Sequence, residues 1–308
     1  MTKWRLGTRG SALAIRQAEL ARQALIARAK DLDVELVTIK TSGDRLAQAD
    51  LSQLGGKGLF VKEIEDALLA GIIDCAIHSL KDLPAEIPNG LVLAAFLERE
   101  DPRDVLISRG PAQSDSLPSG ARVGTSSLRR RVQLLTWRPD LHVEPIRGNV
   151  DTRLRKLREG QFDAIVLALA GLHRLGLDPP HAVPLPPEVM LPAVGQGILV
   201  VETRGDNRAL VETLADVDHG PSRIAAIAER AFLSALGGDC HTPMAAYARL
   251  ENRRLRVDGL VATPDGSRIV GNRVEGPPDS AAELGRQLAR LLHEAGGAEI
   301  VDPLGVRS

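Results

Sequence analysis

The fold is decided by residues 61–77, which read VKEIEDALLAGIIDCAI. The first ten residues are expected to form a helix, and the last five form a mostly apolar run that suits a buried parallel strand. The chain before this stretch has the same rhythm, with strands expected at 4–7 and 34–40 and a helix at 11–30. Such alternation of strand and helix predicts a doubly wound α/β domain.

The alternation of strand and helix starts again after residues 100–104, a charged segment that is expected to connect two lobes. Its expected elements are strands at 105–108, 122–124, 143–146 and 164–168, helices at 127–137 and 150–158, and a long returning strand at 193–202. We therefore expect two lobes, joined by crossings near residues 100 and 195, with a cleft between them.

The alternation of strand and helix ends at about residue 221. A helix expected at 222–236 ends at Gly237-Gly238, a common stop signal. Three short strands and a last helix follow, at 245–250, 255–262, 268–274 and 280–295. The fold class is therefore α/β, with two doubly wound lobes and a small C-terminal α+β domain. The predicted boundaries are 1–99 with 195–219 for lobe 1, 100–194 for lobe 2 and 220–308 for the third domain.

The composition limits the classes of function. A net charge of −1, a pI near 6.7 and 2% aromatic residues argue against a nucleic-acid binder. No run of about 18 apolar residues occurs, so no membrane span is expected. Cys75 and Cys240 lie 165 positions apart and do not form a disulfide framework. We expect a soluble, reducing, cytoplasmic setting.

The most basic segment of the chain is 129–158, with nine basic and three acidic residues. Its net charge is +6, in a chain of 39 basic and 40 acidic residues. Eight of the nine are arginines, whose planar fork pairs with carboxylate or phosphate. The segment predicts an anion site, and charge alone leaves phosphate, nucleic acid or carboxylate open.

Two Gly-Thr turns, at residues 7–11 and 124–127, each lead from an expected strand into a helix. Each would aim the free N–H groups of a helix N-terminus at the cleft. Ordinary N-capping by Ser or Thr explains either turn alone. Arg9 and Arg129 beside the turns favour an anion site.

Residues 55–60, GGKGLF, resemble half of a P-loop but lack its first glycine and its Lys-Ser/Thr pair. A nucleoside triphosphate site is therefore not predicted. The glycines allow close backbone approach to a ligand, with Lys57 as a point charge and Phe60 as an apolar face. The alternative is a flexible turn before the helix at Val61.

Residues 78–82, HSLKD, follow the buried strand at its C-terminal end, where open α/β sheets bind ligands. Asp82 is the candidate acid/base or cation-stabilising carboxylate, and the alternative is a capping or salt-bridged loop residue. Cys240 lies in a glycine-flanked loop, whereas Cys75 is expected to be packing. No metal site is expected, because positions 75 and 78 of one strand point to opposite faces.

Taken together, these motifs resemble the porphobilinogen deaminase (hydroxymethylbilane synthase) family over nearly the whole chain. The markers are residues 5–11, 55–60, 78–82, 98–104, 124–130, 147–150 and 192–197 and the Cys240 loop. The resemblance implies two lobes like type II periplasmic binding proteins and a dipyrromethane cofactor joined to Cys240 by a thioether. Enzymes of this family remove ammonia from porphobilinogen, add four pyrroles in turn to that primer, and release hydroxymethylbilane, a tetrapyrrole, by hydrolysis.

The resemblance also implies a role for each matching residue. Asp82 is the expected catalytic carboxylate, stabilising positive charge as ammonia leaves. The expected cofactor-binding residues are Cys240, Lys81, Asp82, Ser127, Arg129, Arg130, Thr125 and Lys57. The expected substrate-binding residues are Arg9, Ser11, Arg147, Arg153, Phe60, Arg174 and Gln196. Arg5 is carried over as a further contact, whereas Arg155, Lys156 and Arg158 are expected on a solvated face.

Three positions depart from the family pattern: Gln53 replaces a lysine, Asp151 a small residue and Asp239 a glycine. Asp151 is expected to pair with Arg147 or Arg153. The alternative function is a two-lobed binding protein for an organic polycarboxylate, without catalysis. Cys240 discriminates between them, because simple binding needs no tethered ligand. Porphobilinogen is the expected small-molecule partner, no nucleic acid or membrane is expected, and the chain is expected to be a monomer.

Overall fold

A computed structural model describes residues 2–28, 32–42, 61–110, 117–237 and 243–301. The chain divides into two compact units. Unit 1 comprises residues 1–100 and 198–223, and unit 2 comprises 101–197 and 224–308. The division into three domains stays a prediction, because the segment after residue 223 groups with the second lobe.

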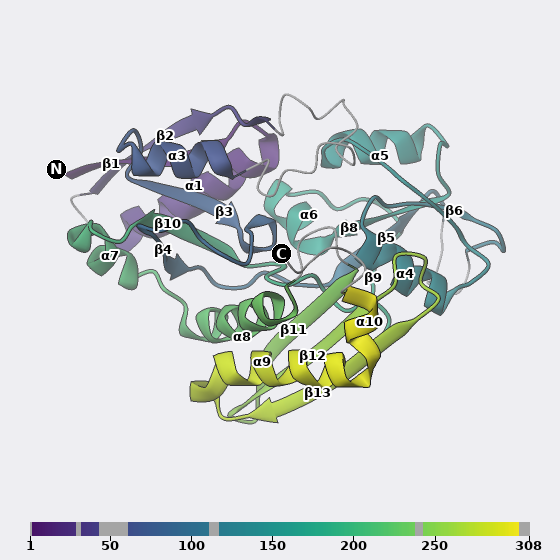
Figure 1. Cartoon of the computed structure of the whole chain (residues 1–308). Coiled ribbons are helices and arrows are strands. Elements are labelled where there is room, and N and C mark those ends of the chain that lie inside the picture. Colours follow the sequence, from purple (N-terminus) through teal and green to yellow (C-terminus); the bar gives the residue numbers. More distant parts are fainter. Residues whose placement is uncertain (1, 29–31, 43–60, 111–116, 238–242, 302–308) are drawn as a thin grey trace. The chain divides into compact units, whose positions relative to one another are not determined.

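Unit 1 is built on a five-stranded mixed sheet of order β2-β1-β3-β10-β4 (Figure 1). β1, β2 and β3 run parallel, whereas β10 is antiparallel to β3 and β4. The elements are β1 (Thr2–Arg9), α1 (Ala12–Arg28), β2 (Leu32–Ile39), α3 (Lys62–Leu69), β3 (Cys75–Ser79), η1 (Leu80–Asp82), β4 (Leu91–Phe96), β10 (Leu199–Arg204) and α7 (Arg208–Ala215).

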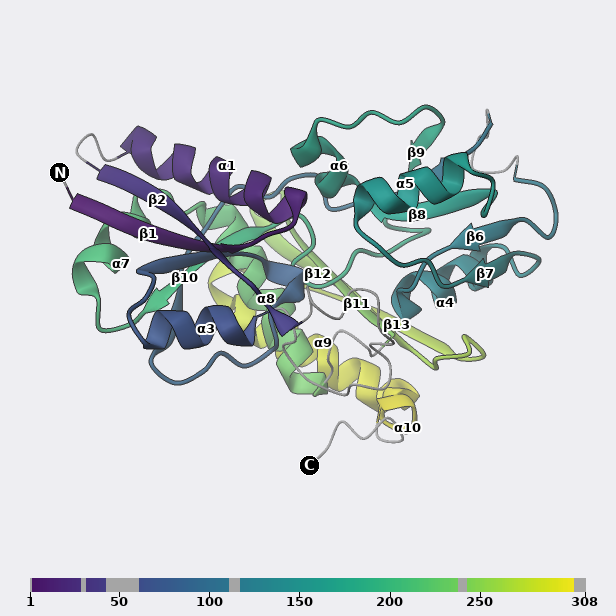
Figure 2. The same ribbon diagram turned by 90° about the horizontal axis from the view of Figure 1, so that it is seen from above.

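Helices α1 and α3 cover opposite faces of this sheet (Figure 2). Cys75 and Ile77 of β3 belong to the apolar cluster that contains α1 residues, and Ala76 belongs to the cluster that contains α3 residues. This alternation follows from the two-residue period of a strand. Both faces of β3 are buried, as predicted, but the strand is parallel only to β1 and is antiparallel to β10. The same period places His78 on the face of α3.

Unit 2 contains a second five-stranded sheet, of order β7-β6-β8-β5-β9. One apolar cluster joins the sheet to α4, and another joins its opposite face to α5 and α6. The elements are β5 (Asp104–Ser108), β6 (Arg122–Gly124), α4 (Leu128–Trp137), β7 (His142–Glu144), α5 (Val150–Arg158), β8 (Ala164–Ala168), α6 (Leu169–Leu175) and β9 (Ala182–Pro184).

The strand directions define one functional edge in each sheet. In unit 2, β6, β7 and β8 are parallel and β5 is antiparallel to β8. The start of β5 therefore lies at the edge where β6, β7 and β8 end. In unit 1, β1 and β3 are parallel, so the turns after them share one edge. Ligands of open α/β sheets bind at such C-terminal edges.

The C-terminal part of unit 2 is a three-stranded antiparallel sheet with helices against it. A Cβ on Gly285 would lie 2.1 Å from the carbonyl oxygen of Ala228, so glycine permits close packing of α9 on α8. The helices and strands of this part are segregated along the chain, which confirms the predicted α+β class. The elements are α8 (Gly220–Leu236), whose first four residues belong to unit 1, β11 (Met244–Glu251), β12 (Arg254–Ala262), β13 (Ile269–Gly276), α9 (Ala281–Leu292) and α10 (Ala298–Val301).

The long strand predicted at 193–202 is wrong over its first half. Residues 194–197 form a turn, and β10 begins only at Leu199. Gly195 and Gly197 have φ values of 71° and 90°, a region that glycine enters without steric cost. Elements β4, α6, α7 and β9 were not predicted.

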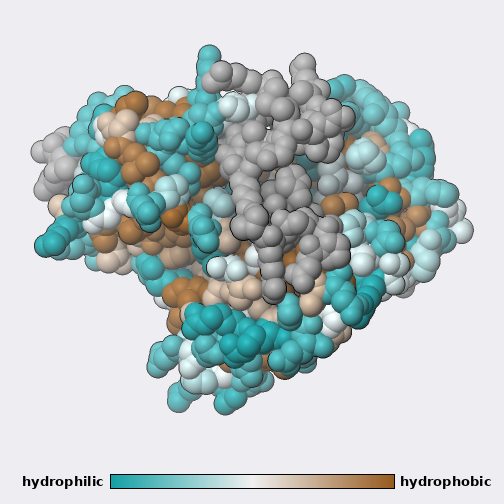
Figure 3. Space-filling view, viewed as in Figure 1, coloured by the Kyte–Doolittle hydropathy of each residue, from teal (hydrophilic) through white to brown (hydrophobic). Residues whose placement is uncertain are grey.

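Among the residues coloured by hydropathy in Figure 3, hydrophilic ones predominate, with apolar patches between them. The exposed large apolar residues in the described ranges include Leu69 and Ile72. Among the helices in those ranges, none has the length and apolar character needed to span a bilayer.

Candidate functional site

The edge of unit 1 carries four of the predicted residues. Arg9 ends β1, Ser11 precedes α1, and Lys81 and Asp82 lie in η1 directly after β3. Asp82 is exposed, whereas the other three are half-buried. The Ser11 hydroxyl accepts a hydrogen bond from the Ala14 amide at 3.3 Å. The first Gly-Thr turn therefore caps its helix, as the alternative interpretation holds, and keeps Arg9 at the sheet edge.

The second Gly-Thr turn lies at the edge of unit 2. The Ser127 hydroxyl accepts from the Arg130 amide at 3.4 Å, which makes Ser127 the N-cap of α4. Thr125 is buried, and its hydroxyl accepts from the Ser127 amide at 3.2 Å. Capping is therefore present at both turns. The second turn fixes the first residues of α4, which include Arg129 and Arg130.

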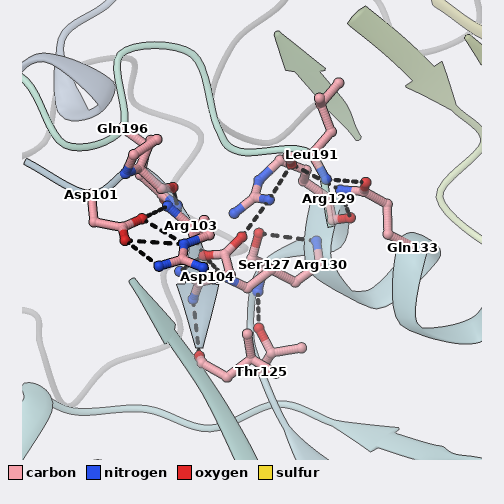
Figure 4. Close-up of polar contacts among 12 residues, drawn as sticks. Asp101, Arg103, Asp104, Thr125, Ser127, Arg129, Arg130, Gln133, Leu191 and Gln196 are labelled. Atoms are coloured by element: carbon pink, nitrogen blue, oxygen red, sulfur yellow. Dashed lines mark hydrogen bonds and ion pairs between the residues drawn. The ribbon is translucent and has the colours of Figure 1, made fainter. Parts of the chain in front are cut away.

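Arg129 and Arg130 converge on the carboxylate of Asp104, which is fully buried at the start of β5 (Figure 4). Arg129 Nη1 donates to Oδ2 at 2.7 Å. Arg130 donates to Oδ1 from Nε at 3.0 Å and from Nη2 at 2.7 Å. The two arginines are themselves only 6% and 7% exposed. The predicted cofactor ligands therefore already share one protein carboxylate.

Backbone carbonyls complete this buried cluster. Arg129 Nη1 also donates to the Leu191 carbonyl at 2.7 Å, and Arg130 Nη1 donates to the Val166 carbonyl at 3.0 Å. Gln133 holds Leu191 in place through its amide group. Burial raises the pKa of a carboxyl, but the Arg129 and Arg130 charges outweigh it and hold the pKa of Asp104 well below its usual range. The cluster is ionised and carries a net charge of +1.

Arg153 of α5 adds a further positive charge at this edge. Its Nε donates to the Gly148 carbonyl at 2.7 Å, and it forms no ion pair with a described residue. Burial, and next the charge of Arg130, lower the pKa of Arg153 to about 10. Repulsion between these cations is relieved by an anion, so Arg153 and Arg130 favour an anionic ligand.

The other basic residues of 147–158 lie closer to solvent. Arg147, Arg155 and Arg158 are exposed, and Arg155 pairs with Glu159 at 3.1 Å. Lys156 is half-buried and donates to the Arg147 carbonyl at 3.2 Å. The predicted solvated face is therefore present for Arg155 and Arg158, whereas Lys156 supports the loop that carries Arg147.

The predicted pairing of Asp151 with Arg147 or Arg153 is absent from the described part of the chain. Asp151 is exposed in the first turn of α5, where its charge complements the helix dipole. Among the described residues, Asp151 therefore does not neutralise the Arg153 guanidinium.

Three more predicted contacts are engaged within the protein. Gln196 is 1% exposed, and its Nε2 donates to Asp104 Oδ1 at 3.0 Å and to the Pro102 carbonyl at 2.6 Å. Arg174 is 8% exposed and donates to the Gly197 carbonyl at 2.5 Å. Arg5 binds Asp74 through its backbone amide, Nε and Nη2. Their roles toward a ligand stay predictions.

Some predicted residues lie outside the described ranges: Lys57, Phe60 and Cys240, together with the departures Gln53 and Asp239. The sequence reasoning missed Asp104, although it lies in the marker motif 98–104. An acidic residue that opens an apolar strand is the available signal for it, because a buried carboxylate requires cationic partners.

Unit 1 contains a second buried cluster of ionisable side chains, made of His78 on β3, Glu202 on β10 and Glu65 on α3. His78 Nε2 lies 3.1 Å from Glu202 Oε2, and these side chains are 5% and 0% exposed. Burial, then the charge of Glu202, raise the pKa of Glu65 to about 7, while His78 partly offsets them. Cys75 faces the other side of the sheet, and burial raises the pKa of its thiol to about 12. No metal-ligand cluster occurs among the residues that the structure describes.

Comparison with known proteins identifies the family. Residues 4–212 match the family model described as "Porphobilinogen deaminase, dipyromethane cofactor binding domain", and residues 223–294 match "Porphobilinogen deaminase, C-terminal domain". The chain belongs to the porphobilinogen deaminase family. The family model itself describes a dipyrromethane cofactor, so the first two lobes are a cofactor-binding region.

Curated relatives agree over almost the full length. The porphobilinogen deaminase of Syntrophomonas wolfei is 49% identical and aligns over 98% of each chain. That of Nitratidesulfovibrio vulgaris is 51% identical over 96% of this chain and 95% of its own. Among solved structures, the methionine-binding protein MetQ covers 70% of this chain and 88% of its own, at 17% identity and a TM-score of 0.42.

Proposed function

We propose that this chain is a hydroxymethylbilane synthase, a transferase of tetrapyrrole and heme biosynthesis. It would deaminate porphobilinogen, join four pyrroles head to tail on a dipyrromethane primer, and release hydroxymethylbilane by hydrolysis. The observation that carries the proposal is family membership over 98% of the chain. The charged side chains at the C-terminal edges of the two five-stranded sheets support it. We further propose that the enzyme works as a monomer in the cytoplasm.

The residues at the edge of unit 2 suit a ligand that carries several carboxylates. Arg129, Arg130 and Arg153 bring three positive charges, and Asp104 is the only described carboxylate paired with any of them. The net charge of +2 in a partly desolvated setting favours an anion. Each pyrrole of a dipyrromethane carries an acetate and a propionate. Arg129, Arg130, Ser127 and Thr125 are therefore proposed to hold such groups of the cofactor, and Arg153 is proposed to hold the equivalent groups of the substrate.

The remaining proposed contacts come from other segments. Lys81, Lys57 and Cys240 are proposed for the cofactor, and Cys240 is proposed to hold it by a thioether. Arg9, Ser11, Arg147, Phe60, Arg174 and Gln196 are proposed for substrate. When bound, dipyrromethane supplies the pyrrole carbon to which the first substrate ring is joined.

Asp82 is the proposed catalytic residue, and its exposed position at the end of β3 leaves its carboxylate open to a ligand. Positive charge develops on the substrate pyrrole as its C–N bond breaks and ammonia leaves. A fixed carboxylate near the ring nitrogen stabilises that charge. Its neighbour Lys81, on the same turn, is proposed to bind a carboxylate and keep the ring beside Asp82.

The cofactor proposal is tested by intact mass. Wild-type protein is expected to exceed its sequence mass by two pyrrole units, and the Cys240→Ser variant to have the bare sequence mass. Cys75→Ser is the matched control and should keep the added mass, because Cys75 is fully buried. An unmodified wild-type mass that persists after incubation with porphobilinogen would contradict the proposal and favour a simple binding protein.

The role of Asp82 is tested by turnover. Asp82→Ala is expected to abolish porphobilinogen consumption with an unchanged melting temperature, because the side chain is exposed. Asp82→Glu keeps the charge but moves it by one methylene, so we expect only a small residual rate. Glu86→Ala removes another exposed carboxylate four residues further along, outside the proposed site residues, and serves as the control. Near-normal consumption by Asp82→Ala would exclude the assignment.

A further inference from the structure

Asp104 is an acidic residue at the centre of a site proposed to bind acids. Its carboxylate accepts four hydrogen bonds from described residues, one from Arg129, two from Arg130 and one from Gln196. Its carboxylate is 0% exposed, so it does not contact solvent. A carboxylate in this place lowers the net positive charge that a ligand meets. Charge attraction alone therefore does not explain why the site contains it.

The way in which the two guanidinium groups contact Asp104 indicates a different role (Figure 4). All three guanidinium nitrogens of Arg130 donate, two of them to Asp104 and one to the Val166 carbonyl. Arg129 donates through Nη1 alone, to Asp104 and the Leu191 carbonyl. Its Nε and Nη2 have no hydrogen-bond partner among the described residues. This edge of a guanidinium is the one that binds a carboxylate in bidentate fashion.

The backbone holds Asp104 at a fixed place for this purpose. Asp104 pairs with Ala168 in the register of β5 and β8, and its carbonyl accepts from the Leu185 amide at 2.8 Å. Gln196 links the carboxylate to the Pro102 carbonyl. The acceptor is therefore rigid, whereas an arginine on its own has several freely rotating bonds. Fixing the guanidinium before binding removes an entropic cost from ligand capture.

We infer that Asp104 is a positioning residue, which fixes Arg129 and Arg130 so that the Nε–Nη2 edge of Arg129 receives one carboxylate of the pyrrole ligand. Gln196 supports Asp104 in this role and is a second positioning residue. The inference rests on the proposed function for the identity of the ligand. The competing role for Asp104 is that of a simple counter-ion to two buried cations.

Two substitutions separate these roles, because charge and geometry change independently. Asp104→Asn removes the negative charge and so makes the site more positive by one unit. A counter-ion role predicts tighter binding of an anion, whereas a positioning role predicts weaker binding. Asp104→Glu keeps the charge and moves it by one methylene. A counter-ion role predicts wild-type binding, and a positioning role again predicts weaker binding.

The measurements are the fraction of protein that carries the cofactor, by intact mass, and KM and kcat for porphobilinogen consumption. Because Arg129 is proposed to hold the cofactor, the cofactor-carrying fraction is the measure of binding. For both variants we expect this fraction to fall about tenfold or more, the scale of a charge-assisted hydrogen bond. Asp140→Asn is the matched control, because Asp140 pairs with Arg138 by two 2.7 Å bonds at the surface of the same unit. It should bind like wild type.

Wild-type or tighter binding by Asp104→Asn, or wild-type binding by Asp104→Glu, would overturn the inference. If neither variant folds, Gln196→Leu removes a donor to Asp104 and keeps every charge, and it should lower the cofactor-carrying fraction by a few fold. Unchanged binding by Gln196→Leu would then overturn the inference. The proposed function fails separately, if wild-type protein binds porphobilinogen without consuming it.

Discussion

The two units each bury a cluster of ionisable side chains, and the clusters differ in how their carboxylates are satisfied. In unit 2, Asp104 accepts from two arginines and a glutamine. In unit 1, the 3.1 Å contact of Glu202 Oε2 with His78 Nε2 does not have hydrogen-bond geometry, and both Glu202 oxygens and Glu65 Oε1 have no hydrogen-bond partner among the described residues. The same functional group is therefore fully paired in one unit and poorly paired in the other.

This difference sets the protonation of each cluster. Two adjacent guanidinium charges hold the pKa of Asp104 well below its usual range, even though burial acts in the opposite direction. Glu65 has no arginine partner among the described residues, and burial and the neighbouring Glu202 raise its pKa to about 7. Burial alone does not decide the charge state of a carboxylate. The number of fixed donors around it does.

The largest effect is expected from breaking the paired cluster. Asp104→Ala leaves two buried guanidinium groups without their carboxylate, and we expect a loss of roughly 3–5 kcal/mol in the free energy of unfolding. Urea unfolding at pH 7 measures it. Because the pKa of Asp104 is depressed, its contribution is complete above the unfolded-state pKa, so the loss should be equal at pH 5 and pH 8.

Asp140→Ala is the control for that measurement. Asp140 also pairs with an arginine, but its side chain is 34% exposed, and we expect a loss within about 1 kcal/mol. Equal losses for the two variants would show that the buried cluster does not differ from a surface pair. A loss for Asp104→Ala that changes between pH 5 and pH 8 would contradict the ionised state of the carboxylate.

How well the sequence predicts a feature depends on how far apart in the sequence its contacting residues lie. The strand at Cys75–Ser79 was predicted because its apolar pattern is local. The pairing of Asp104 depends on residues 25, 26 and 92 positions away, which no local pattern specifies. Motif matching could name Arg129 and Arg130 as ligand contacts. It could not show that the carboxylate of Asp104 already accepts hydrogen bonds from both guanidinium groups.

The unit 1 cluster was harder to predict for the same reason. His78 and Glu202 are diagonal neighbours across an antiparallel pair, since His78 pairs with Val200 and Ala76 with Glu202. That pairing requires the crossover that brings β10 next to β3. One long strand was expected at 193–202, and the turn glycines Gly195 and Gly197 explain why β10 starts only at Leu199.

A smaller effect is expected from Glu65, and its sign is the opposite of that for Asp104. The folded protein retains a proton on Glu65 up to about pH 7, whereas the unfolded chain releases it near the ordinary value of 4.5. Stability is therefore lost as the pH rises between these values. Glu65→Gln removes this loss. We expect the variant to match wild type at pH 5 and to be more stable at pH 8 by on the order of 1 kcal/mol.

Urea unfolding of both proteins at pH 5 and pH 8 tests the expectation, with Glu35→Gln as the control. Glu35 pairs with Lys3 at the surface of the same unit, where both side chains are about half exposed, and its removal should change stability by less than about 1 kcal/mol at either pH. The charged groups around Glu65 are Glu202, His78 and Asp66. A Glu65→Gln variant that is less stable than wild type at pH 8 would mean that His78 compensates the Glu65 charge, and the contrast between the two clusters would then disappear.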